Sequence, residues 1–354
     1  MIKLTNLEKD LLSLPLEELG EIAFEKKRKV SQDFVYFTHN YHINYSNECL
    51  ALCPMCAFGK PLGKGYTLSL KEVEDKLKKL KEKKKNILEI HIVGSLNPNL
   101  PYKYYISLIE LAKKYFPEST VKAFTATEIA YLSKKESKSI EDILKDMKVA
   151  GLDVLPGGGA EILKDDLRKI LCPNKIDSFT YLKVHKIAHK LKIKTNITML
   201  FGHIESWEDR IYHLKLINEV YKETEGFLVF IPLLFHPKNT KFEGKVKKVF
   251  PAEIYRLIAI SRILLDIPHI KSYWVMLTPK VAQTALLFGA DDLDGCVYEE
   301  KITKYAKRSS PDYLNEENLK KLIWDVDLTP VLRDGKFNIK KVYEKREYAY
   351  SCKH

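Results

Sequence analysis

Short apolar segments alternate along the chain with longer stretches in which apolar residues recur every three or four positions. The first pattern is typical of buried β-strands and the second of amphipathic helices. Strands are predicted near 34–44, 88–93, 120–124, 152–155, 196–201, 227–233 and 271–276. Helices are predicted near 6–29, 70–83, 102–115, 137–149, 178–190, 252–265 and 279–288, and after Ser206. This regular order indicates parallel strands covered by helices.

Two of the predicted helices begin with capping signals. Ser69 and Glu72 form a capping-box pair before the helix near 70–83. Ser206 and Asp209 form an N-cap pair for the helix that follows the fifth strand. Both pairs place a helix directly after a strand or its loop, as a repeated β-α unit requires.

The predicted elements give at least six β-α units, which favours an α/β fold with a full or partial (β/α) barrel of the TIM type. No linker rich in Gly, Pro or Ser divides the chain. We expect a helical extension at 1–33 and the barrel at 34–302. A lysine-rich extension at 303–354 is expected to pack on the outside or to close one barrel end.

Polar or glycine-bearing segments follow six of the predicted strands. In a (β/α) barrel the loops after the strands surround one pocket, and the chemistry takes place there. After a cysteine-bearing loop, these segments are GSLNP (94–98), TATE (125–128), PGGGAE (156–161), GHIE (202–205) and FHPKNT (235–240). The sequence therefore predicts a single site at one rim of the barrel.

Charge changes the picture little. The 354 residues carry a formal charge of +12, and the lysine run at 76–85 would suit a nucleic-acid partner. Val73, Leu77 and Leu80 share one helical face of that region, so the lysines are expected on its solvated side. The apolar run at 227–235 is too short to span a membrane and contains a proline. We expect a cytoplasmic protein with no nucleic-acid or membrane partner.

The most specific pattern is the spacing C-x3-C-x2-C of Cys49, Cys53 and Cys56. Three thiolates can hold three irons of a 4Fe-4S cluster and leave the fourth iron open to a small molecule, an arrangement suited to radical chemistry on S-adenosylmethionine. A structural zinc site is the alternative, and it would need a fourth ligand. The other cysteines are scattered singly, without a second C-x2-C pair. The missing second pair favours the cluster over zinc. A zinc-stabilised basic binding module is the non-enzymatic alternative.

Glycines and an acidic residue mark the fourth loop. Gly157, Gly158 and Gly159 let the backbone approach a ligand closely, whereas a strained turn needs only one or two glycines. Glu161 is a candidate acceptor for a ribose hydroxyl or an amine. We expect this loop to contact a nucleotide-like ligand.

Two histidines lie in the later loops. His203 and His236 are candidates for proton handling or for holding a substrate carboxylate, because imidazole titrates near neutral pH. The acidic strip at 291–295 lacks the spacing of a calcium loop. We expect it to be a surface turn or a segment that closes the barrel.

Taken in order, these segments resemble the radical S-adenosylmethionine superfamily and, within it, the aminofutalosine synthase family of the futalosine route to menaquinone. The resemblance covers nearly the whole chain. The matching stretches are HINYSNEC, CAFGK, YTLSLKEV, AFTATEI, GLDVLPGGGAEI, TMLFGHIE, FIPLLFHPKNT, YWVML and FGADDLDG.

The resemblance implies roles for individual residues. The three cysteines would ligate the cluster, and Phe58 would pack near the adenine. Gly94 and Ser95 stand at the glycine-rich strand end that contacts the methionine amine. The adenine-supporting pattern G-x-I-x-G-x-x-E falls on Thr198, Leu200, Gly202 and Glu205. This chain departs from the family at Ser95, Asn97 and Thr198, which leaves the details of those contacts open.

The resemblance also implies the reaction. An electron from reduced flavodoxin or ferredoxin would start cleavage of S-adenosylmethionine, and the 5'-deoxyadenosyl radical would add to 3-[(1-carboxyvinyl)oxy]benzoate. Rearrangement and decarboxylation would give aminofutalosine and methionine. A buried cation or histidine pair should hold the substrate carboxylates.

Two sister radical enzymes remain alternatives. One is cyclic dehypoxanthine futalosine synthase, against which His236 and the segment 125–128 argue. The other is the group of deazaflavin-forming enzymes, whose pattern departs further.

Overall fold

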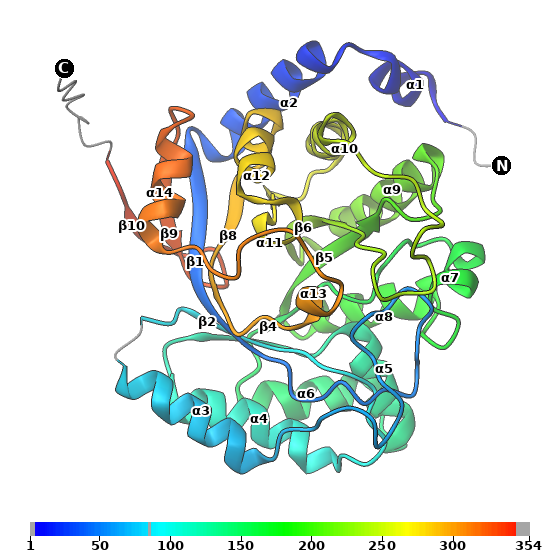
Figure 1. The fold of residues 1–354 in the computed structure, drawn as a ribbon, viewed down its shortest axis with the longest axis vertical. Coiled ribbons are helices and arrows are strands. Elements are labelled where there is room, and N and C mark those ends of the chain that lie inside the picture. The colour runs from blue at the N-terminus through cyan, green and yellow to red at the C-terminus, as the bar shows by residue number, and fades with distance from the viewer. Residues whose placement is uncertain (1–3, 84–85, 345–354) are drawn as a thin grey trace.

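The strands form one curved sheet (Figure 1) in a computed structural model that describes residues 4–83 and 86–344. All neighbouring strands are parallel except β9 and β10. The strands are β1 (Phe34–Ile43), β2 (Glu89–Ile92), β3 (Thr120–Ala123), β4 (Val154–Leu155), β5 (Lys194–Phe201), β6 (Phe227–Leu234), β7 (His269–Ile270), β8 (Asp292–Tyr298), β9 (Thr329–Arg333) and β10 (Ile339–Val342).

The sheet order is β10-β9-β1-β2-β3-β4-β5-β6-β7, and β8 pairs with the other edge of β1. The end of β7 reaches β8 through an isolated parallel bridge between Lys271 and Asp292. There the Ser272 amide donates to the Asp292 carbonyl oxygen at 2.7 Å, and the Asp291 amide donates to the Ile270 carbonyl oxygen at 3.0 Å. The sheet thus curls back onto its first strand, and the predicted α/β barrel fold is confirmed.

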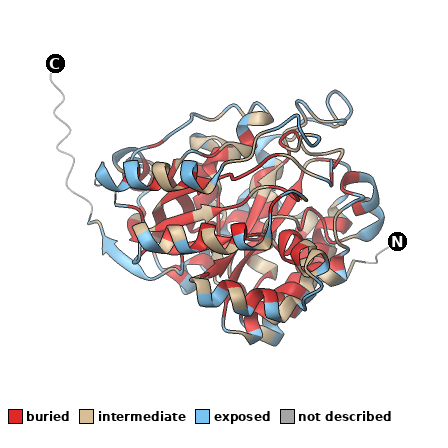
Figure 2. Cartoon of the chain, turned by 90° about the horizontal axis from the view of Figure 1, so that it is seen from below, coloured by how far each residue is buried: buried red, intermediate tan, exposed pale blue. Residues whose placement is uncertain are grey.

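Helices cover the outside of the sheet (Figure 1). Their buried faces and the strands form the apolar core, whereas the outward faces are exposed (Figure 2). The helices are α1 (Asn6–Ser13), α2 (Leu16–Ser31), α3 (Leu70–Glu82), α4 (Tyr102–Tyr115), α5 (Ala126–Lys135), α6 (Ile140–Ala150), α7 (Asp165–Leu171), α8 (Ser178–Lys190), α9 (Trp207–Thr224), α10 (Pro251–Leu264), α11 (Trp274–Leu277), α12 (Pro279–Ala285), η1 (Leu286–Phe288), α13 (Ile302–Tyr305) and α14 (Glu316–Trp324).

The predicted helix caps are present. Ser69 and Glu72 form the capping box of α3, and Ser206 and Asp209 form that of α9. The buried face of α3 consists of Val73, Leu77 and Leu80. Its lysines therefore lie on the solvated side, as expected, although residues 84–85 of the lysine run lie outside the described residues. None of the helices in 4–83 and 86–344 is long and apolar enough to cross a bilayer.

The structure corrects the prediction of a strand near 271–276. Strand β7 is only His269–Ile270, and the apolar run that follows forms the short helix α11. The indole nitrogen of Trp274 donates to the Gly295 carbonyl oxygen at 2.9 Å, so this side chain is buried against β8. A short apolar run fits a strand and a buried helix equally well, which explains the error.

Helices α5, α7, α11, α13 and α14 were not predicted, and the acidic strip is not a surface turn. Helix α5 begins inside the TATE segment, where Thr125 and Glu128 form a capping box, and α7 was missed. The strip at 291–295 lies in and just before β8, and its residues are buried. Its role as a barrel-closing segment is confirmed, because β8 lies between β1 and the end of β7.

The C-terminal segment contributes directly to the sheet. The N-terminal part of β1 pairs with β9, from Phe34 with Thr329 to Phe37 with Leu332. The side chain of Arg333, at the end of β9, is 1% exposed and reaches into the barrel. At the other end of the chain, Arg256 on α10 donates to the carbonyl oxygen of Leu14 at 2.9 Å and so ties α1 to the barrel.

Candidate active site

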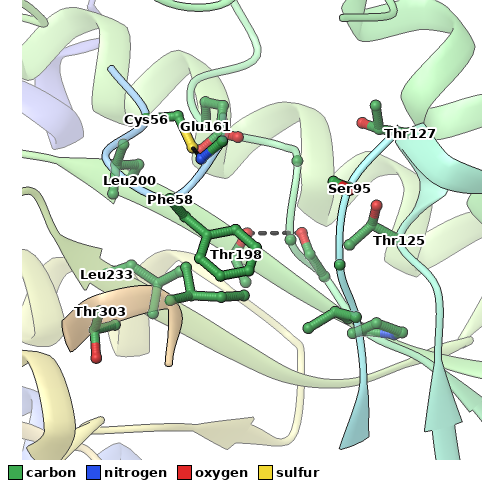
Figure 3. Close-up of a pocket in the computed structure, with 18 of the residues that line it drawn as sticks. Cys56, Phe58, Ser95, Thr125, Thr127, Glu161, Thr198, Leu200, Leu233 and Thr303 are labelled. Carbon is green, nitrogen blue, oxygen red and sulfur yellow. Dashed lines mark hydrogen bonds between the residues drawn. The ribbon is translucent and has the colours of Figure 1, made fainter. Parts of the chain in front are cut away.

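A cavity of about 360 Å³ opens among the loops that follow the strands and extends into the barrel. Most of the residues proposed from the sequence line it. They are Cys49, Cys53, Cys56, Phe58, Gly94, Ser95, Gly157, Gly158, Gly159, Glu161, Thr198 and His236. Figure 3 shows Cys56, Phe58 and Glu161 close together, with Ser95, Thr125 and Thr127 across from them. The cavity does not include Gly202, His203 or Glu205 in its lining.

The cysteine loop directly follows β1 and is fixed by its backbone. The Cys49 amide donates to the Lys60 carbonyl oxygen at 2.8 Å, and the Ser95 hydroxyl donates to the Glu48 carbonyl oxygen at 2.7 Å. The Gly59 amide donates to Cys56 Sγ at 3.2 Å. These bonds hold the loop against the end of β2.

The three cysteines of the C-x3-C-x2-C spacing lie at one end of the cavity. All three are free, and all face one cavity. Within residues 4–83 and 86–344, no three His, Cys, Asp or Glu side chains converge closely enough to hold one metal ion, which gives no support to the zinc alternative. In a 4Fe-4S cluster each thiolate binds a different iron, so the sulfurs stand further apart.

The fourth loop places a charged pair beside the cysteines. Glu161 has a left-handed backbone (φ 49°), which is uncommon for a residue other than glycine. Its carboxylate accepts a hydrogen bond from Lys175 Nζ at 2.6 Å. Burial alone would raise the pKa of Glu161, but the charge and hydrogen bond of Lys175, together with the charges of Arg168 and His203, outweigh burial and lower that pKa. Lys175 was not identified from the sequence, because it lies 14 residues further on in a segment without a motif.

The structure gives a different reason for a glycine at each of the three positions of this loop. A Cβ on Gly157 would lie 2.7 Å from the Ile197 Cα, so the loop backbone packs directly on β5. Gly159 has a φ of +92°. Gly158 would meet only the Thr125 Cγ2, at 3.2 Å. Packing and backbone conformation thus explain two of the glycines, and Gly158 is the one with the weakest structural requirement.

Replacing Gly157 by alanine should therefore destabilise the protein by about 1–3 kcal/mol, because the clash is with a strand backbone that cannot move aside. Gly158→Ala is the matched control and should cost less. Urea unfolding of both variants measures the difference. Equal stabilities would contradict this account of the loop.

Glu128 connects the second and third loops. Its carboxylate accepts hydrogen bonds from the Tyr45 hydroxyl at 2.7 Å and from the Gly94 amide at 3.2 Å. A Cβ on Gly94 would lie 2.7 Å from the Tyr45 ring, so this glycine is needed for close packing. Burial raises the pKa of Glu128. The capping-box spacing of Thr125 and Glu128 was the signal that could have identified this residue.

The segment Gly202 to Glu205 forms a buried turn behind the cavity. The Glu205 carboxylate accepts hydrogen bonds from the Gly202 amide at 2.6 Å, the His203 amide at 2.8 Å and the Arg210 guanidinium at 2.6 Å. The His203 side chain is fully buried, with Nε2 3.0 Å from the Leu200 carbonyl oxygen. His203 is not among the residues that line the cavity, and its contact with a substrate stays a prediction. The ring holds the turn that ends β5.

The Glu205 turn should make the protein sensitive to acid. Burial alone would raise the pKa of Glu205, but the bonds and charges of His203 and Arg210 lower it to about 2. A lowered carboxyl pKa stabilises the fold above the unfolded-state pKa, and this stabilisation is lost as the pH falls toward 2. The shift corresponds to roughly 3 kcal/mol. In Glu205→Gln, the unfolding free energy should therefore change less between pH 5 and pH 2, as measured by urea unfolding, than in the exposed control Glu208→Gln.

His236 lies on an apolar wall of the cavity. Its Nε2 is 3.0 Å from the Met276 carbonyl oxygen, and burial lowers its pKa. The neighbouring lining residues include Leu200, Leu233, Phe235 and Met276. His236 is therefore placed to meet a ligand, which leaves its predicted role open to test.

The inner end of the cavity is polar, and the sequence analysis did not anticipate it. His42 on β1, His91 on β2 and Lys122 on β3 are register neighbours. All three line the cavity. The ring centroids of His42 and His91 are 4.7 Å apart. The alternation of polar residues along these strands was the available signal, since every second residue of a strand faces the same side.

Two family profiles together match most of the chain. A profile of the radical SAM superfamily matches residues 43–217, and a profile of the CofH/MqnC C-terminal region matches residues 224–346. The chain is 39% identical to an aminodeoxyfutalosine synthase from Streptomyces coelicolor, over 92% of this chain and 87% of that protein. It is 36% identical to one from Thermus thermophilus, over 88% and 85%.

A differently named relative matches at the same identity as the Thermus thermophilus protein. The chain is 36% identical to a 5-amino-6-(D-ribitylamino)uracil–L-tyrosine 4-hydroxyphenyl transferase from Methanococcoides burtonii, over 92% of both chains. Among solved structures, methylornithine synthase matches with a TM-score of 0.72 at 16% identity, over 92% of this chain and 93% of that one. The [FeFe]-hydrogenase maturase HydG matches with a TM-score of 0.71 at 15% identity, over 92% and 72%. These structural matches support the barrel fold.

Proposed function

Because this chain belongs to the radical S-adenosylmethionine superfamily, in the group that carries the CofH/MqnC C-terminal region, we propose that it is an aminofutalosine (aminodeoxyfutalosine) synthase of menaquinone biosynthesis. The observation that carries the proposal is the 39% identity to a protein of that name over most of both chains. The chain is accordingly an enzyme of the radical transferase type. Its substrates would be S-adenosylmethionine and 3-[(1-carboxyvinyl)oxy]benzoate.

The proposed cofactor site is the cysteine end of the cavity. Cys49, Cys53 and Cys56 would hold a 4Fe-4S cluster. When bound, this cluster and S-adenosylmethionine supply a 5'-deoxyadenosyl radical. The nucleotide would be held by residues that line the same end of the cavity, namely Phe58, Gly94, Ser95, Gly157, Gly158, Gly159, Glu161 and Thr198. Gly202 and Glu205 would support this site from behind by fixing the end of β5.

The rest of the cavity suits an aromatic substrate with carboxylates. Leu200, Leu233, Phe235 and Met276 offer an apolar wall for a ring, and such a wall keeps water away from a reactive carbon. Holding the alkene near the radical carbon is the main task left to the protein. We further propose reduced flavodoxin or ferredoxin as the electron donor.

A second candidate function is supported by one observation. The tyrosine 4-hydroxyphenyl transferase from Methanococcoides burtonii matches at 36% identity over 92% of both chains, level with the Thermus thermophilus synthase. This sister enzyme is therefore nearer than the motif comparison alone suggested. Its substrates, by its name, are L-tyrosine and 5-amino-6-(D-ribitylamino)uracil.

The test is an anaerobic assay. Protein reconstituted with iron and sulfide is given dithionite, S-adenosylmethionine and 3-[(1-carboxyvinyl)oxy]benzoate, and products are followed by mass spectrometry. A parallel reaction contains L-tyrosine and 5-amino-6-(D-ribitylamino)uracil instead. Aminofutalosine in the first reaction supports the proposal. A coupled product only in the second reaction would replace it with the transferase, and 5'-deoxyadenosine alone would point to the cyclase.

A further inference from the structure

The inner end of the cavity contains buried polar atoms without a partner. His42 is 7% exposed and Asn196 is 3% exposed, and both line the cavity. Within the described part of the chain, His42 Nε2 and Asn196 Oδ1 have no hydrogen-bond partner. Leaving such atoms unsatisfied costs free energy, so they indicate a place where a ligand supplies the missing bonds.

These atoms lie on strands that are far apart in the sheet order. His42 is on β1 and Asn196 is on β5. Since the sheet curls back onto β1, side chains that point inward from these strands face one another across the barrel. An amide can present either its oxygen or its N–H groups, and an imidazole can donate or accept. A small polar group between them could bond to both sides.

The fixed charges around this end of the cavity cancel. Lys122 pairs with Glu89 at 2.8 Å, Lys271 pairs with Asp294, and Arg333 pairs with Asp292 at 2.5 Å. The Glu300 carboxylate, which also lines the cavity, lies 3.9 Å from Arg308 Nε, so four cations meet four carboxylates. A further anion placed here would therefore lack a counter-charge unless another group gained a proton.

The pair of His42 and His91 can gain this proton. Burial lowers the pKa of His42 and of His91, which favours the neutral form of both rings before a ligand binds. The charges that act on the His42 ring come from Glu300, Asp294, Glu89 and Lys122. Those that act on the His91 ring come from Lys122, Asp294 and Lys271, beside the His42 ring itself. An anion in contact with either ring favours its charged form, because opposite charges attract strongly at low dielectric.

We propose that His42 and His91 bind the benzoate carboxylate of the substrate at the inner end of the cavity, and that this binding takes up about one proton. The inference rests on the proposed function. The alkene of that substrate must face the cysteine end, where the radical forms, so the benzoate carboxylate points to the opposite end. The imidazole pair meets it there, with Asn196 on the far wall.

Calorimetry can measure the proton uptake on binding directly. 3-[(1-Carboxyvinyl)oxy]benzoate is titrated into cluster-loaded protein without S-adenosylmethionine, so that no turnover occurs. Repeating the titration in two buffers with different ionisation enthalpies gives the number of protons taken up. We expect about one proton per ligand near pH 7, and an affinity that falls by up to about tenfold per pH unit as the pH rises, because proton uptake and ligand binding are linked. The dimethyl ester should show no proton uptake.

Three single variants complete the experiment. His42→Gln and His91→Gln keep a hydrogen-bonding side chain but cannot titrate, so each should weaken binding at least about tenfold or reduce the proton uptake. His39→Gln is the matched control, because His39 is on the same strand but contacts Asn86 and Glu316 outside the cavity. The cluster absorbance and circular dichroism show whether each variant is folded.

The outcomes separate the two proposals. Wild-type protein that forms aminofutalosine but binds the benzoate without proton uptake, or folded His42 and His91 variants that bind it as the wild type does, would overturn this inference and leave the proposed function standing. Wild-type protein that neither binds nor converts the benzoate would overturn both. Should His42→Gln fail to fold, the wild-type proton count and His91→Gln still decide.

Discussion

Cys53→Ala should abolish both the brown colour of the reconstituted protein and all cleavage of S-adenosylmethionine. Cys53 is buried at the cavity, between the other two cysteines of the spacing. Two thiolates would leave two corners of the cluster without a protein ligand. Iron analysis, absorbance and an assay for 5'-deoxyadenosine check the prediction. Retained colour together with retained cleavage would contradict the assignment of these cysteines.

Cys172→Ala is the matched control for this experiment. Cys172 is also buried, and it lies near Cys53. It stands outside the cysteine spacing and is absent from the cavity lining. We expect this variant to keep its cluster. Loss of colour in Cys172→Ala with retention in Cys53→Ala would instead identify Cys172 as a ligand.

Arg333→Met should lower the free energy of unfolding by about 3–5 kcal/mol, because removing one partner of a buried ion pair leaves the other charge uncompensated. Arg333 is 1% exposed, with its guanidinium 2.5 Å from the Asp292 carboxylate and 4.0 Å from that of Glu89. Methionine replaces the aliphatic part of the arginine side chain and removes its charge. Urea unfolding at neutral pH measures the loss.

An exposed arginine provides the comparison. Arg28 is 51% exposed and pairs with Asp33 at 3.1 Å. Arg28→Met should cost at most about 1 kcal/mol, since solvent screens such pairs. If the two variants proved equally stable, the barrel interior would not depend on the Arg333 charge.

The order of strands and helices was predictable because each element has its own periodicity. Helix α4 was predicted with the bounds that it has in the structure, and the capping boxes at Ser69 and Ser206 located two helix starts. The strand near 271–276 was wrong because its apolar run has no distinctive period. Local pattern therefore identified the long elements and failed at the short ones.

The residues at the rim of the site were predictable from the order of the elements. Loops after parallel strands meet at one edge of the barrel, so the cysteines and Glu161 could be assigned to one cavity from the order of elements alone. The burial of the His203 ring could not be predicted, because its orientation depends on the turn that Glu205 holds, which no spacing reveals. The functional roles of these residues remain predictions to be tested as described above.

The interior of the barrel could not be predicted from local patterns. Glu89, Lys122 and Arg333 come from three strands, and Arg333 lies more than 200 residues after the other two. Pairs of this kind depend on which strands become neighbours and in what register. The alternation of polar residues in β1 and β2 was the one local signal that these side chains face the barrel interior.

The position of Arg333 has a consequence for protein engineering. The substrate specificities of related enzymes are often exchanged by fusing the front part of one chain to the back part of another. Here the junction between the two matched regions, near residue 220, would separate Glu89 and Lys122 in the front part from Asp292, Asp294, Lys271 and Arg333 in the back part. A chimera would inherit each ion pair intact, but the 4.0 Å approach of Arg333 to Glu89 would cross the junction. Functional hybrids should therefore arise mainly from parents that share both of these residues.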